Sequence, residues 1–255
     1  MDGCGSEMMQ SARMRRAGIK PGRLLWVLPV AFLVLFFLLP LGSILSLMLS
    51  RSDVVSLKGL WQPLWFSLWQ AAVSTLLTLA LGLPAAWVFA RFNFRGKGAL
   101  RLLSTLPFIL PTVVVAAGFT ALLGPRGLVN TWLMAALNLE NPPIAFMNTL
   151  GAILLAHVFY NTSVVIRVVG SSLAQFDPRY EQAGQVLGGS PWLVFREVTL
   201  PLLRPSSLIA GLMVFLFDFT SFGVILLLGG PKFSTLEVAI YTQSLSMLNL
   251  RMAGI

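Results

Sequence analysis

Charge is scarce in this chain. Of its 255 residues, 11% are charged and 56% are hydrophobic, which lies outside the range of ordinary soluble domains. The single cysteine, Cys4, excludes a disulfide framework and a cysteine-based metal site. The chain has one histidine, no Gly-Lys-Ser/Thr phosphate loop and no His-Glu-x-x-His zinc motif, so we expect no enzyme, no cofactor and no bound metal. This composition is typical of a membrane protein.

Five charge-poor runs are long enough to cross a bilayer as helices, because a helix needs about 20 apolar residues to do so. They extend roughly over Trp26–Leu49, Leu64–Ala90, Leu102–Leu123, Met147–Ile166 and Ser206–Leu228. Each is too long for a transmembrane strand and lacks the alternation of a barrel strand. The sequence therefore predicts an all-α fold, a polytopic transmembrane helical bundle, in which 1–23 form a basic cytoplasmic tail and 24–255 the membrane domain.

Basic residues set the expected orientation. Thirteen of the 18 lysines and arginines lie in the tail, between the second and third runs, or between the fourth and fifth. The positive-inside rule places these segments, and with them the N-terminus, in the cytoplasm. The basic residues form short clusters between apolar runs, so we expect the lipid bilayer and no nucleic acid as a partner. The last residues, 251–255, resemble the opening of a sixth helix, and we expect the sequence to stop within it.

The loop before the fifth run carries the clearest helix signals. Asp177 can cap a helix that starts at Pro178, and Gly188–Gly189 can end it. Ser190–Pro191 repeats the start signal for a second helix, which Pro201 disrupts or joins to the next span. The loop is therefore predicted to be a helix-turn-helix on the cytoplasmic surface.

Two functions remain open for this loop from its local sequence. Small residues at Ala183 and Gly184 let its first helix approach another protein closely, in the helix-in-groove mode. The alternative is an amphipathic loop that lies on lipid headgroups.

The same loop resembles the EAA motif of the permeases of ABC importers. Gln182-Ala183-Gly184, Gly188 and Val198-Thr199-Leu200-Pro201 stand in register with that motif. Gln182 replaces its glutamate, although Glu181 is adjacent, while Gly184 and Val198 replace an alanine and an isoleucine. This puts a specific role for the glutamate in doubt.

The resemblance extends over roughly residues 60–250 and implies the type I importer permease fold. Residues 24–255 would then be the permease domain. Its core would start at about residue 60, and the sequence would stop within the last helix of that core. It implies that the first helix of the loop couples the permease to an ATP-binding cassette subunit. It also implies an extracytoplasmic substrate-binding protein and a second permease half or a homodimer partner, in the inner membrane. The residues assigned to the coupling loop are Glu181, Gln182, Ala183, Gly184, Gly188, Val198, Leu200 and Pro201.

Polar residues inside the spans are the candidates for the substrate pathway. His157 and Asn161 share a helix face, and Asp218 is followed closely by Thr220 and Ser221. They either line the pathway or form buried contacts between helices, and Asp218 can instead pair with His157 or Arg167.

The stretches around 154–161 and 229–241 look most like the thiamine importer permease and next like ferric-iron permeases, both of which carry two permease halves on one chain. By that resemblance this sequence is the N-terminal half, and its substrate is thiamine or ferric iron. Two alternatives stay open, an ion-coupled secondary transporter that uses His157 and Asp218, and a non-functional fragment of a longer permease.

Overall fold

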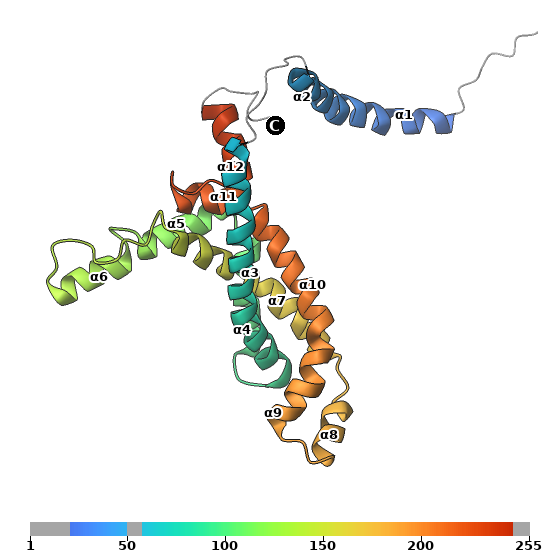
Figure 1. The fold of residues 1–255 in the computed structure, drawn as a ribbon, viewed down its shortest axis with the longest axis vertical. Helices are drawn as coiled ribbons and strands as arrows, with labels where there is room; N and C mark the ends of the chain where they lie inside the picture. Colours follow the sequence, from blue (N-terminus) through green and yellow to red (C-terminus); the bar gives the residue numbers. More distant parts are fainter. Residues whose placement is uncertain (1–20, 50–57, 247–255) are drawn as a thin grey trace, which may run out of the picture. The chain divides into compact units, whose positions relative to one another are not determined.

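The computed structural model describes residues 21–49 and 58–246, which are helices joined by loops. The chain divides into two units, one of residues 1–54 with 250–255 and one of residues 55–249. Cys4, most of the predicted tail and the expected opening of a sixth helix lie outside the described residues. Figure 1 shows the helices of both units.

The described part of the first unit is one apolar helix. It consists of α1 (Pro21–Leu33), the π-helical segment η1 (Val34–Leu38) and α2 (Leu39–Leu49), and the backbone stays helical across both junctions. The side chains described between Trp26 and Ser46 are all exposed within this unit. A helix that is apolar on every side is suited to lipid or to other membrane helices.

The second unit contains the remaining helices in chain order. They are α3 (Lys58–Arg91), α4 (Lys97–Ile109), α5 (Thr112–Leu123), α6 (Leu128–Leu137), α7 (Leu150–Ala174), α8 (Arg179–Val186), α9 (Pro191–Val194), η2 (Phe195–Thr199), α10 (Leu200–Phe219), α11 (Phe222–Val224), η3 (Ile225–Gly229), α12 (Leu236–Tyr241) and η4 (Thr242–Ser246). The segments η2, η3 and η4 are π-helical.

The core of this unit is the bundle of α3, α7 and α10, which run side by side (Figure 1). Buried residues such as Ala86, Val165 and Val214 form its centre. Gly82 lets α3 and α7 approach closely, because a Cβ atom there would lie 2.7 Å from Cβ of Val165. Small residues at such contacts are the usual means of helix association in membranes, where burial from water gives no driving force.

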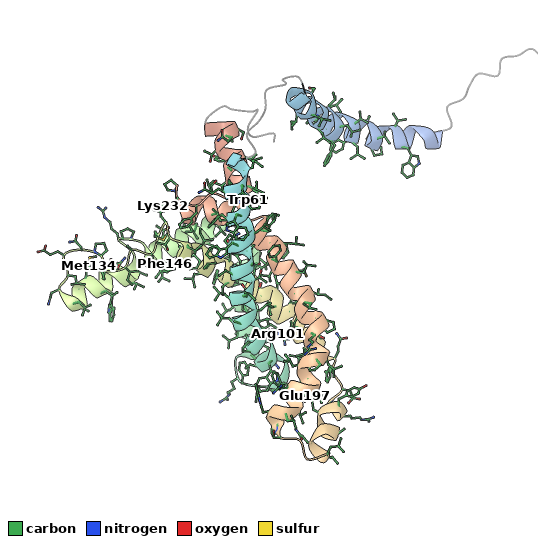
Figure 2. All side chains as sticks on the ribbon, in the orientation of Figure 1. Trp61, Arg101, Met134, Phe146, Glu197 and Lys232 are labelled. Carbon is green, nitrogen blue, oxygen red and sulfur yellow. The ribbon has the colours of Figure 1, made fainter. Side chains whose placement is uncertain are left out.

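A second apolar cluster closes the other end of the bundle. Ile153 of α7 lies there against Ile225 and Leu228 of η3, all fully or almost fully buried. Figure 2 shows Trp61 and Lys232 at this end of the unit and Glu197 at the opposite end. The helix-turn-helix loop therefore lies far along the bundle from η3.

Among the described residues, five helical stretches are long and apolar enough to cross a membrane, as predicted. They are Trp26–Ser46, Gly59–Arg91, Thr112–Leu137, Leu150–Ala174 and Pro191–Phe219.

The predicted boundaries of three spans were wrong. The fourth run, expected to end at Ile166, continues as α7 to Ala174. The expected run Leu102–Leu123 is broken at Leu110, whose backbone is extended. Pro111 explains the break, because a proline disfavours helical backbone in the residue before it. The stretch that can cross a membrane is therefore α5 continued by α6.

The expected fifth run, Ser206–Leu228, starts earlier and ends earlier than predicted. Helical backbone continues from α9 through η2 into α10, so Pro201 lies inside a continuous helical stretch, just after the π-helical turn η2. Pro201 does not break this stretch, since the π-helical turn already departs from the regular α-helical hydrogen-bond pattern. The helix ends at Phe219, after which Ser221 is extended.

Candidate functional site

The helix-turn-helix loop forms as its signals predict. Asp177 Oδ1 accepts a hydrogen bond from the Arg179 backbone N–H at 2.9 Å, next to the start of α8. Gly188 ends the first helix with a φ of 83°, a conformation that favours glycine. Ser190 Oγ accepts from the Leu193 backbone N–H at 3.3 Å and caps α9.

The residues assigned to coupling point in different directions. Gln182 and Ala183 are exposed on α8, as is Leu200 at the start of α10, and Val198 and Pro201 are half-buried. Gly184, expected on the docking face, instead faces α9, because a Cβ there would lie 3.0 Å from Cγ2 of Val194. The glycine thus lets α8 and α9 pack together.

Several apolar side chains of this region are strongly exposed. Val186 and Leu187, at the end of α8, expose 87% and 88% of their surface. Tyr180 on α8 and Trp192 on α9 are also exposed. Such a group of apolar side chains at the tip of a loop is typical of a surface that another protein or a membrane covers.

Among the residues assigned to coupling from the sequence, Glu181 is the one with charged and polar partners in the described part of the chain. It forms an ion pair with Arg91, the last residue of α3. Its Oε1 atom also accepts a hydrogen bond from Thr199 Oγ1 at 2.7 Å, and Thr199 is buried. Sequence reasoning counted Arg91 only as a topology signal, and no local pattern links it to residue 181.

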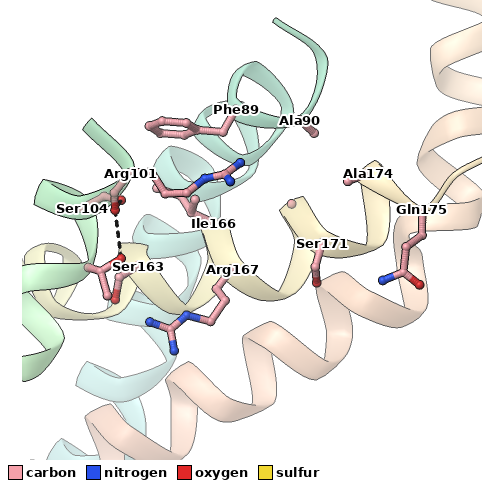
Figure 3. Close-up of a pocket in the computed structure, with 12 residues that line it drawn as sticks. Phe89, Ala90, Arg101, Ser104, Ser163, Ile166, Arg167, Ser171, Ala174 and Gln175 are labelled. Carbon is pink, nitrogen blue, oxygen red and sulfur yellow. Dashed lines mark hydrogen bonds between the residues drawn. The ribbon is translucent and has the colours of Figure 1, made fainter. Parts of the chain in front are cut away.

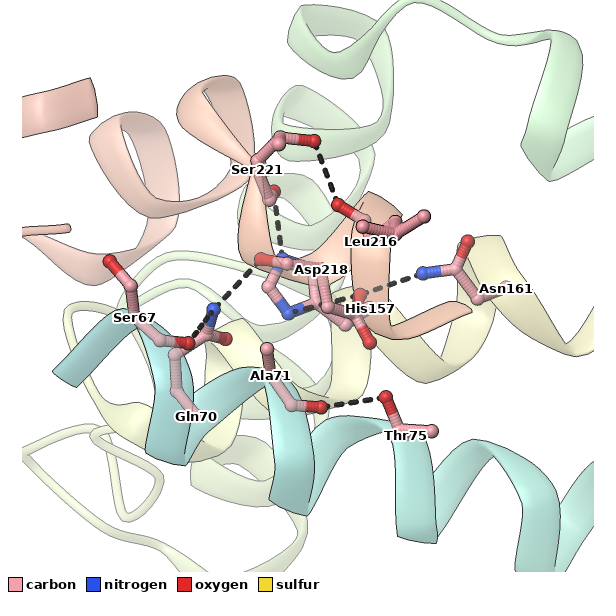
Figure 4. Close-up of polar contacts among 10 residues, drawn as sticks. Ser67, Gln70, Ala71, Thr75, His157, Asn161, Leu216, Asp218 and Ser221 are labelled. Atoms are coloured by element: carbon pink, nitrogen blue, oxygen red, sulfur yellow. Dashed lines mark hydrogen bonds and ion pairs between the residues drawn. The ribbon is translucent and has the colours of Figure 1, made fainter. Parts of the chain in front are cut away.

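Asp218 lies at the centre of a buried polar cluster between α3, α7 and α10 (Figure 4). Its Oδ1 accepts a hydrogen bond from Asn161 Nδ2 at 2.7 Å and lies 3.5 Å from Nδ1 of His157. His157 Nε2 lies 2.8 Å from Ser221 Oγ. The structure thus brings together four of the five residues expected to line the substrate pathway.

Three members of this cluster are closed to solvent in the second unit, while Ser221 is half-buried. Asp218 has no exposed surface, and His157 and Asn161 expose 2% and 4%. Thr220 is exposed, and its hydroxyl donates to the Leu216 carbonyl at 2.8 Å within its own helix. In this conformation the cluster forms buried contacts between helices, which is the second of the two alternatives. Of the five residues predicted for the substrate pathway, Thr220 is the exposed one.

The sequence reading missed the contribution of α3 to this cluster. Gln70 Nε2 donates to the Asp218 backbone carbonyl at 2.8 Å. Ser67, Gln70, Ser74 and Thr78 are all fully buried and recur at helical spacing on one face of α3. This polar stripe within an apolar span is the signal that could have identified it.

A cavity of about 420 Å³ lies between α3, α4 and the second half of α7 (Figure 3). Its polar lining includes Arg101 and Arg167 with Ser163, Ser171 and Gln175. None of the residues predicted for the pathway lines it. Across the described residues, no group of three or more His, Cys, Asp or Glu side chains is arranged to hold a metal ion.

The fold is shared with a chain of a solved ABC transporter. The chain matches a chain of the bacterial alginate ABC transporter, solved in complex with an alginate pentasaccharide-bound periplasmic protein, with a TM-score of 0.71 and 20% identity. The match covers 91% of this chain and 85% of that one.

Two curated relatives are similar in sequence. The thiamine transport system permease protein ThiP of Escherichia coli is 34% identical over 239 residues, which is 91% of this chain and 43% of ThiP. PhnU of Salmonella choleraesuis, named for 2-aminoethylphosphonate transport, is 27% identical over 87% of this chain and 82% of PhnU. The chain thus spans less than half the length of ThiP.

The family model named "binding-protein-dependent transport system inner membrane component" matches residues 79–255, more than half of the chain. That segment includes the helix-turn-helix loop and both α7 and α10. The chain therefore belongs to the family of binding-protein-dependent transport system inner membrane components.

Proposed function

We propose that this chain is a permease subunit of an ATP-driven importer and that α8 and α9 form the surface on which a separate ATP-binding subunit docks. The observation that carries the proposal is the exposed apolar tip of this loop, formed by Val186 and Leu187 beyond the end of the bundle. Solvated loops rarely present such side chains without a partner.

The positions of the basic residues support a cytoplasmic location for this loop. Arg91, Arg95 and Lys97 lie between α3 and the first turn of α4, and Arg196 and Arg204 lie close to the loop. By the positive-inside rule this end of the bundle faces the cytoplasm, where ATP is available, and the basic residues of the tail predict a cytoplasmic N-terminus by the same rule. Lys232 then lies on the outer side, where an extracytoplasmic binding protein would deliver substrate.

The second partner is another permease half. Many apolar side chains remain exposed on α5 and α10, among them Val113, Leu208 and Leu212. A half on the same chain, a separate subunit or a second copy of this chain would face it across the substrate pathway. Alternating access then requires the two halves to move relative to each other.

Thiamine is the proposed substrate. Its support is the similarity to ThiP over 91% of this chain. Ferric iron, the other substrate expected from the sequence, and 2-aminoethylphosphonate, for which PhnU is named, are the comparison substrates in the assay. Asp218 would reach a cationic substrate only if the helices around it separated, because its side chain has no exposed surface.

Uptake into proteoliposomes tests this function and its main rival together. The complete importer, containing this chain, its ATP-binding subunit and its binding protein, should accumulate radiolabelled thiamine only with ATP inside. An uncoupler should leave uptake unchanged while ATP is maintained. Uptake that needs no ATP and collapses with the uncoupler would instead establish the ion-coupled secondary transporter.

A further inference from the structure

Glu181 joins α8 to two other helical elements at once. Its Oε1 atom faces the Arg91 guanidinium at the end of α3 and the Thr199 hydroxyl at the end of η2. Thr199 directly precedes α10, so the carboxylate connects the loop to two of the three helices of the bundle. The third, α7, packs against both.

The local electrostatics favour this arrangement. Arg91 lies in the last turn of α3, where the helix dipole favours a cation, and Glu181 lies in the first turn of α8, where it favours an anion. The two side chains expose only 23% and 22% of their surface. The pair is therefore less screened by water and salt than the neighbouring Arg196–Glu197 pair, whose side chains expose 68% and 61%.

The side chain of Glu181 does not lie on the exposed face of α8. Its carboxylate turns toward the bundle, while Gln182, Val186 and Leu187 are exposed. Residue 181 is thus suited to transmit a movement of α8, and its exposed neighbours are suited to contact a partner. Thr199 lies in a π-helical turn, and this also supports a functional role for its contact with Glu181, since such turns are frequent at functional sites.

We infer that Glu181 is a positioning residue that fixes α8 to the ends of α3 and α10 through Arg91 and Thr199. It does not contact the ATP-binding subunit, which docks on Gln182, Val186 and Leu187. This inference rests on the proposed function and deepens it, because it assigns docking and force transmission to different residues of one short helix. A movement imposed on α8 is then passed directly to the bundle.

The test uses the complete importer with Glu181→Arg, Arg91→Glu and the double variant that exchanges the two charges. Two quantities are measured, the amount of ATP-binding subunit that co-purifies and the number of substrate molecules transported per ATP hydrolysed. Glu197→Gln is the matched control, because Glu197 is an exposed, ion-paired glutamate near the same loop.

We expect both single variants to retain the ATP-binding subunit and to lower the transport-to-hydrolysis ratio about tenfold, within the range of coupling changes caused by single substitutions. The charge exchange should restore the ratio to within about threefold of the wild type, because the opposite charges face each other again. Glu197→Gln should change neither quantity.

Thr199→Val provides a milder perturbation if the charged variants fail to fold. It removes one donor to Glu181 and should lower the ratio about threefold with docking intact. Loss of the ATP-binding subunit in Glu181→Arg, an unchanged ratio in Thr199→Val, or no recovery in the charge exchange would overturn the inference. If the wild-type chain retained no ATP-binding subunit, the proposed function itself would fail, which is a distinct result.

Discussion

The close contact between α3 and α7 makes Gly82→Ala the most informative stability variant. The added Cβ atom would lie 2.7 Å from Cβ and 2.8 Å from Cγ1 of Val165, whereas non-bonded carbons prefer about 3.5–4.0 Å. The helices must then separate, and overpacking of this kind costs about 1–3 kcal/mol. Replacing glycine by alanine inside a helix stabilises the helix by about 1 kcal/mol. We expect a net loss of about 1 kcal/mol in the free energy of unfolding.

The measurement is the midpoint of SDS-induced unfolding in mixed micelles, followed by helical circular dichroism. Gly118→Ala is the control, because nothing lies within 4 Å of a Cβ atom at that position. It should leave stability unchanged or raise it slightly. In a Val165→Gly background the cost of Gly82→Ala should disappear, since the obstructing Cβ is gone. An equal cost in both backgrounds would refute the proposed contact.

Three further stability predictions follow from single contacts. Asp218→Asn keeps an oxygen that can accept from Asn161 and should unfold close to the wild type, whereas Asp218→Leu leaves that buried amide unpaired and should cost about 1–3 kcal/mol in the same SDS assay. Ser190→Ala removes the cap of α9 and should cost that helix about 1 kcal/mol, seen as faster amide hydrogen exchange at Leu193. Gly230→Ala should lower the thermal unfolding midpoint in detergent, because residue 230 has a φ of 67° and a Cβ would lie 2.8 Å from Asn148 Oδ1. An unchanged exchange rate or midpoint would contradict the respective contact.

The spans were predictable because lipid imposes one simple requirement on sequence. A segment that crosses the hydrocarbon core must be long, apolar and helical, so composition alone indicated five spans. The boundaries depended on local backbone chemistry that hydropathy does not measure. Pro111 divides an apolar run, while Pro201 follows a π-helical turn and leaves the helix continuous. Proline therefore has to be interpreted by its place in the helix and by the residue before it.

The candidate site was predictable only in part, for a related reason. The signals of the helix-turn-helix loop are local, so Gly188 and Ser190 could be assigned from neighbouring residues. The partners of Glu181 could not, because Arg91 is 90 residues away in the chain. The contact of Asp218 with Gln70, in the polar stripe of α3, likewise joins residues 148 apart in the chain. Such contacts follow from helix packing and leave no local pattern.

The central claim, that α8 is the docking surface for an ATP-binding subunit, is tested most directly by co-purification. The wild-type chain is compared with Leu187→Asp, at the tip of the loop, and with Leu139→Asp, an exposed leucine in the loop after α6. The account predicts that the wild type and Leu139→Asp retain the ATP-binding subunit in mild detergent and that Leu187→Asp loses it. Equal retention by all three would show that the subunit docks elsewhere and would contradict the account.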